Sequence, residues 1–148
     1  MNMDPSTFAT IGIAVATLGS AGSAAYAIIS CAPALASVTS EKPEYGSKLL
    51  ITIVLGEALA IYGLLIAFMI VSKLPVITTA DAGIQALFAG IAMGGSAVAA
   101  SIGISYCGPA LMTAMVEKPE SYTINILGVV LSEALAIYGL LIAFMLVP

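Results

Sequence analysis

The chain has 148 residues, of which 61% are hydrophobic and only 8% are charged, and its formal net charge is −4. Soluble domains contain about 25% charged residues, so this composition indicates a membrane protein and excludes an ordinary soluble domain. With four lysines, no arginine, no histidine and two cysteines that lie 76 positions apart, we expect no nucleic-acid partner, no metal-ligand cluster and no cysteine–histidine catalytic pair.

The first apolar stretch covers about residues 6–40, which exceeds the roughly twenty residues that a helix needs to cross a bilayer. Small residues recur in it every three or four positions and fall on one helical face, where they permit another helix to approach closely. Pro33 predicts a kink or a weakened helix near residue 29. The small residues are Gly12, Ala16, Gly19, Ser23 and Ala27.

A short polar loop, Glu41–Glu44, separates this stretch from a second apolar stretch at about residues 47–72. The two stretches therefore predict a helical hairpin. In the second stretch Gly56 and Gly63 belong to a small-residue packing face. Glu57 lies at the border between that face and a bulkier stripe that we expect to face lipid.

The rest of the chain repeats this hairpin, so we divide it into residues 1–76 and 77–148, the second with spans at about 79–116 and 123–147. The thirteen residues EALAIYGLLIAFM at positions 57–69 return unchanged at 133–145. The predicted fold is an all-α membrane protein of four transmembrane helices, in two tandem hairpins that run in the same direction. The predicted packing glycines of the second copy are Gly90, Gly94 and Gly139.

Lysines are more frequent at one predicted end of the hairpins than at the other. Three of the four, Lys42, Lys48 and Lys118, lie at the loops Glu41–Glu44 and Glu117–Glu120. By the positive-inside rule, these loops are expected to face the cytoplasm.

Glu57 and Glu133 each open a copy of the repeated segment and are the candidate ion-binding residues. A charged side chain at the centre of a membrane helix costs about 2.5–3.5 kcal/mol on insertion scales, and intramembrane ionisable groups are usually functional. Apolar surroundings favour the neutral form of a carboxyl group, so each glutamate is suited to take up and release a proton. The alternative is a protonated glutamate that only joins two helices by a hydrogen bond.

Four side chains are candidates for supporting these carboxyl groups. Tyr62 and Tyr138 lie five residues after each glutamate, about 140° around the helix, so the partner of each hydroxyl is equally well a group on a neighbouring helix. Ser23, which falls at about the depth of the carboxylates when counted from the loop proline, and Ser101 are further possible oxygen donors.

The duplicated hairpin, its small-residue first helices, its proline-containing polar loop and the segment EALAIYGLLIAF resemble the two-hairpin proteolipid subunits of V-type and archaeal A-type rotary ATPases, over the whole chain. Each glutamate follows its loop proline by fourteen residues, at 43 and 57 and again at 119 and 133. The short Arg-Gln-Pro loop of the F-type branch is absent, and Glu-Lys-Pro-Glu stands in its place.

The resemblance implies a non-enzymatic subunit that carries ions within a rotary ATPase or ATP synthase. It implies a homo-oligomeric ring in the lipid bilayer, a stator subunit of a/I type with a membrane arginine, and central-stalk subunits bound at the loops Glu41–Glu44 and Glu117–Glu120. The expected location is the cell membrane, with a prokaryotic plasma membrane favoured. Many two-hairpin relatives keep a carboxylate only in the second hairpin, so Glu57 is a departure that would double the ions carried per chain.

The transported ion is expected to be H⁺, with no other cofactor. In the family, the odd-numbered spans line the inner circle of the ring. Sodium-carrying members place Gln on such a span and a hydroxyl directly after the carboxylate. This chain has Ile28 and Ile104 in place of Gln, and Ala58 and Ala134 in place of the hydroxyl. Na⁺ bound at Glu57 and Glu133 remains the alternative. Two other classes are a tetraspan packing or adaptor protein that transports nothing, and a simple channel, which ranks lower because the inner stripes contain no ring of charges.

Overall fold

The chain forms four long helices joined by three single turns of 3₁₀-helix, in a computed structural model that describes residues 4–148. All four helices are long and apolar enough to cross a membrane, which confirms the predicted all-helical fold. The helices are α1 (Pro5–Glu41), α2 (Gly46–Lys73), α3 (Ala80–Glu117) and α4 (Tyr122–Leu146). The turns are η1 (Pro43–Tyr45), η2 (Leu74–Val76) and η3 (Pro119–Ser121).

The helix ends follow from local sequence. The Asp4 carboxylate accepts a hydrogen bond from the backbone N–H of Ser6, at 3.0 Å, and Thr79 Oγ1 accepts one from the N–H of Ala82, at 3.3 Å. These side chains satisfy backbone donors that have no partner within the helix. Helices α1 and α3 end where a proline follows two residues later, because the residue before a proline disfavours helical geometry.

Helix α1 continues through Pro33 to Glu41, so the weakened site that the sequence predicted near residue 29 does not end the helix. The surroundings supply the reason. Cys31 is fully buried, and its thiol donates to the carbonyl of Ile104 in α3, with 3.7 Å between sulfur and oxygen. Packing against a neighbouring helix holds a proline-containing turn that would be weak in isolation.

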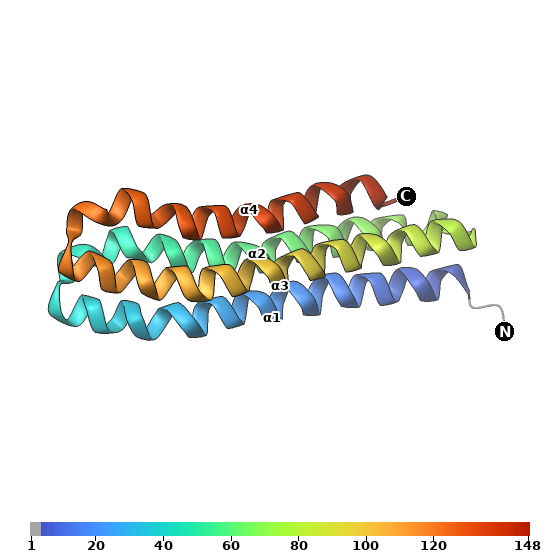
Figure 1. The fold of residues 1–148 in the computed structure, drawn as a ribbon. Coiled ribbons are helices and arrows are strands. Elements are labelled where there is room, and N and C mark those ends of the chain that lie inside the picture. The colour runs from blue at the N-terminus through green and yellow to red at the C-terminus, as the bar shows by residue number, and fades with distance from the viewer. Residues whose placement is uncertain (1–3) are drawn as a thin grey trace.

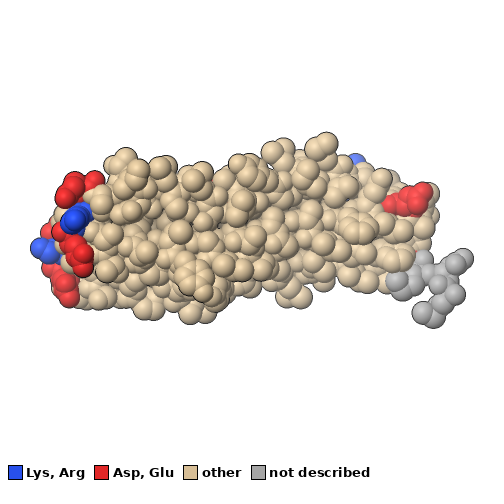
Figure 2. All heavy atoms as spheres, viewed as in Figure 1, with Lys and Arg blue, Asp and Glu red and all other residues tan. Residues whose placement is uncertain are grey.

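Figure 1 shows the four helices side by side along one long axis, with η1 and η3 together at one end and η2, the start of α1 and the end of α4 at the other. Both hairpins therefore point the same way. Figure 2 shows that on the visible face Lys, Asp and Glu gather at the two ends and leave the long middle uncharged. This distribution suits a bundle that crosses the hydrocarbon core of a bilayer.

Helices α1 and α3 are in close contact along their small-residue faces. A Cβ atom added to Gly94 would lie 2.7 Å from the carbonyl oxygen of Val15, and one added to Gly19 would lie 2.9 Å from Cα of Gly94. A side chain on Gly90 would collide with the backbone of Gly12. In a membrane, such small residues allow the backbones to approach and gain van der Waals contact.

The same contact between the two helices of a hairpin occurs once in each hairpin. Gly63 of α2 packs against Ser20 of α1, and Gly139 of α4 packs against Ser96 of α3, 76 positions later. The two hairpins are thus built alike.

Candidate functional site

Glu133 is the buried carboxylate of the bundle. It lies on α4 with only 6% of its surface exposed, on the same face as the buried residues Val129 and Ala136. Its carboxylate accepts a hydrogen bond from the hydroxyl of Tyr62, which comes from α2 in the other hairpin. Of the two partners that the spacing left open for Tyr62, the tertiary structure therefore selects a carboxylate on a neighbouring helix.

The surroundings of the Tyr62–Glu133 pair determine what the Glu133 carboxylate can bind. A buried, ionised carboxylate is costly in a low dielectric unless hydrogen bonds compensate it. Among the described residues the Tyr62 hydroxyl is its one hydrogen-bond donor, set among apolar side chains. Such a carboxylate is only partly compensated, so binding of a proton or another cation would neutralise it and favour its burial.

Glu57 occupies a different environment although its segment is identical. In the single chain it is exposed, on the same helix as the exposed side chains Ile61, Leu64 and Phe68. No described residue makes a hydrogen bond to it. Tyr138, which corresponds to Tyr62, is 63% exposed and likewise has no hydrogen bond within residues 4–148.

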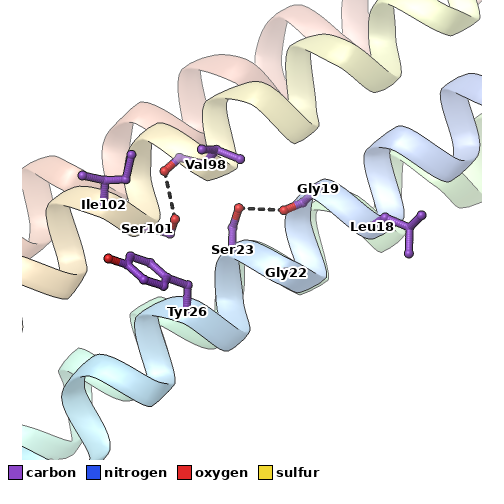
Figure 3. A pocket seen from close by; sticks show the side chains of 8 residues that line it. All are labelled: Leu18, Gly19, Gly22, Ser23, Tyr26, Val98, Ser101 and Ile102. Atoms are coloured by element: carbon purple, nitrogen blue, oxygen red, sulfur yellow. Dashed lines mark hydrogen bonds between the residues drawn. The ribbon is translucent and has the colours of Figure 1, made fainter.

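The two candidate serines donate their hydrogen bonds to backbone carbonyl groups of their own helices. Ser23 Oγ donates to the Gly19 carbonyl at 2.6 Å, and Ser101 Oγ donates to the Val98 carbonyl at 2.9 Å. Figure 3 shows both hydroxyls turned toward their own helices, on the facing sides of an open pocket of about 420 Å³ between α1 and α3. Neither serine contacts the Tyr62–Glu133 pair by a hydrogen bond, so their supporting role stays a prediction.

Of the two residues directly before the carboxylates, Gly56 was predicted as a packing glycine, whereas Ser132 was not among the predicted site residues. In the second hairpin Ser132 packs against Gly103, whereas in the first hairpin Gly56 packs against Ala27, at 3.0 Å from the added Cβ to the Ala27 Cβ. The glycine of this contact therefore lies on the second helix of the first hairpin (Gly56 on α2) but on the first helix of the second hairpin (Gly103 on α3). Comparing the repeats position by position would have shown it, because residues 56 and 132 differ beside two identical segments.

Metal binding by a cluster of side chains finds no support in the described part of the chain. Within residues 4–148, no three His, Cys, Asp or Glu residues form a group that could hold a metal ion.

The chain is similar to known proteins along nearly its whole length. The family model of the ATP synthase C subunit matches it twice, at residues 11–70 and 87–146. The 16 kDa proteolipid subunit of the V-type proton ATPase from Nephrops norvegicus is 32% identical over 142 residues, which cover 94% of this chain and 89% of that protein. The Homo sapiens protein of the same description is 31% identical over 141 residues, covering 95% and 91%. The V-type proton ATPase proteolipid subunit of Dictyostelium discoideum is 29% identical, covering 94% and 72%.

Proposed function

The chain belongs to the family of V-type ATPase proteolipid subunits, with two repeats of the ATP synthase C-subunit type, and we propose that it carries protons by reversible protonation of Glu57 and Glu133. It is a multi-pass membrane component of an ATPase complex and is not itself catalytic. The observation that carries the proposal is the buried Glu133 carboxylate with its single hydrogen-bond donor among residues 4–148, Tyr62.

The proposed transport step depends on charge and environment. An ionised glutamate is costly against hydrocarbon, whereas a protonated one is not, so only a loaded site can turn toward lipid. The carboxyl group takes a proton at one half-channel of a stator subunit of a/I type, remains neutral while the rotor turns, and releases the proton beside a stator arginine. The chain supplies the carrying group, and other subunits supply ATP chemistry.

We further propose that identical chains form a closed ring in the bilayer and that central-stalk subunits bind its loop end. The loops Glu41–Glu44 and Glu117–Glu120 support this, because both lie at the same end of the bundle, next to the turns η1 and η3 (Figure 1). We assign this end to the cytoplasm. A prokaryotic plasma membrane stays a prediction, since the three relatives named above are eukaryotic proteins.

Two carboxylates per chain would raise the number of protons carried per turn of the ring. Moving one elementary charge across 100 mV yields about 2.3 kcal/mol, so a rotor with more ions per turn can make ATP against a smaller voltage. We therefore infer a complex that is able to run as an ATP synthase.

The test is labelling of the purified complex with dicyclohexylcarbodiimide, which reacts with protonated carboxyl groups in apolar surroundings. We expect adducts at Glu57 and Glu133, by peptide mass spectrometry, and parallel loss of ATP-driven proton transport. Labelling without inhibition would instead favour the packing or adaptor protein. Protection of both residues by added Na⁺ at constant pH would replace the proton by Na⁺ as the carried ion.

A further inference from the structure

We propose that the Glu57 site is completed by Tyr138 of an adjacent copy of the chain, so that the assembly alternates one site within each chain with one site between chains. This inference rests on the ring proposed above. It concerns which residues form the second site and when that site forms, neither of which follows from family membership.

The contact observed within the chain is the template. Tyr62 belongs to the first hairpin and Glu133 to the second, so the hydrogen bond between them joins one hairpin to the next. The segments around them are identical, at residues 57–69 and 133–145, and the two family matches are offset by the same 76 positions. Continuing the relation by one hairpin pairs Tyr138 with Glu57 of the following copy.

Both groups of the inferred pair are uncovered in the single chain. Tyr138 is 63% exposed, Glu57 is exposed, and within residues 4–148 neither has a hydrogen-bond partner. Their counterparts Tyr62 and Glu133 are half-buried and buried, and they are hydrogen-bonded to each other. The two unpaired groups are therefore those that an adjacent hairpin would cover.

A second pair of repeat-related positions, on α1 and α3, supports the same arrangement. Within the chain Gly19 of α1 lies against Gly94 of α3. The repeat-related pair between copies is Gly95 and Leu18 of the next copy. A Cβ atom added to Gly95 would have no neighbouring atom within 4 Å, and Leu18 is 73% exposed. In the inferred arrangement, the open space beside Gly95 would face the exposed Leu18 of the next copy, which could fill it.

Another repeat-related position indicates that the contact between copies is wider than the contact within the chain. Gly12, whose backbone touches Gly90 within the chain, corresponds to Phe88, which is 53% exposed. A phenylalanine cannot reproduce the backbone contact of a glycine. The Glu133 site is therefore formed within each folded chain, whereas the Glu57 site forms only on assembly and between more widely spaced helices.

The experiment uses the purified complex with the matched variants Tyr138→Phe and Tyr62→Phe. The rate of carbodiimide labelling is measured separately at each glutamate. Loss of the donor destabilises the ionised carboxylate, so Tyr138→Phe should raise the rate at Glu57 by roughly two- to tenfold and leave Glu133 unchanged. Tyr62→Phe should do the reverse. A rate at Glu57 that does not respond to Tyr138→Phe, or that responds to Tyr62→Phe, overturns the inference.

Disulfide cross-linking provides a readout that does not depend on the tyrosines. In a Cys31→Ala, Cys107→Ala background, Leu18→Cys with Gly95→Cys should give a ladder of covalent oligomers on oxidation, and either cysteine alone should not. Cross-linking confined to single chains overturns the inferred arrangement of copies. If wild-type Glu57 and Glu133 are both unlabelled by carbodiimide, the proposed function itself fails. If they are labelled but Tyr138→Phe has no effect, only this inference fails.

Discussion

At the residue level, two glutamates at the start of identical segments have different surroundings. Glu133 is buried and hydrogen-bonded to Tyr62, and Glu57 is exposed. The difference arises because Glu133 has the first hairpin beside it within the same chain, whereas Glu57 has no corresponding hairpin there. Chemical identity of a segment therefore does not make its two copies equivalent in the isolated chain.

Glutamine substitution tests the two residues separately. Glu133→Gln and Glu57→Gln each remove a group that can change charge while keeping its size, so each should reduce ATP-driven proton transport by tenfold or more. The measurement is acidification of vesicles that contain the reconstituted complex. Abolition by Glu133→Gln, together with unchanged transport and ATP coupling in Glu57→Gln, would remove Glu57 from the carrying cycle and with it the argument for synthesis at low voltage.

At the element level, close packing of α1 with α3 depends on glycines whose replacement has a defined cost. Gly90→Ala places a Cβ against the backbone of Gly12, and overpacking of this kind costs about 1–3 kcal/mol. Gly22→Ala is the control, because nothing lies within 4 Å of that position and alanine favours a helix. The thermal unfolding midpoint of the purified complex should be lowered only by Gly90→Ala. Equal midpoints for both variants would contradict tight packing of α1 on α3.

The contact beside each carboxylate offers an exchange experiment. Gly103→Ala would collide with Ser132 and should destabilise the second hairpin by about 1–3 kcal/mol. Adding Ser132→Gly recreates the Ala27–Gly56 pair of the first hairpin and should restore most of the loss, as a non-additive effect. The measurement is the thermal unfolding midpoint of the Gly103→Ala variant, compared with that of the Gly103→Ala, Ser132→Gly double variant. Additive losses would show that the two hairpins do not share this packing rule.

At the scale of the whole molecule, the chain is a bundle of four apolar helices in which Glu57 and Glu133 are the two acidic residues near the middle of the apolar spans. The visible face carries its charges only at the ends (Figure 2), and Glu57 and Glu133 lie on α2 and α4. Saturating carbodiimide should therefore add two adducts per chain, measured as intact mass. A single adduct would reduce the ions per turn by half.

A reconstituted assembly of this chain without other subunits should conduct no ions. In the proposed mechanism, its carboxylates exchange protons with water only through the half-channels of a stator. Measured as proton flux into liposomes under an imposed voltage, the expected result is flux no greater than that of empty liposomes. Steady conductance would instead support the simple channel.

The sequence by itself determined the four membrane helices, the duplicated hairpin and the candidate carboxylates. Hydropathy, repeat spacing and a charged residue within an apolar run all depend only on the linear order of the residues. It could not determine the partner of Tyr62, since an angle of about 140° around the helix left both Glu57 and a group on a neighbouring helix open. It predicted a kink or a weakened helix at Pro33, and the structure shows that α1 continues through this residue to Glu41. The contact of Cys31 with α3 is a tertiary contact that the sequence of one helix does not reveal. The tertiary structure decided which carboxylate is buried within the chain, since burial depends on which hairpin lies beside it.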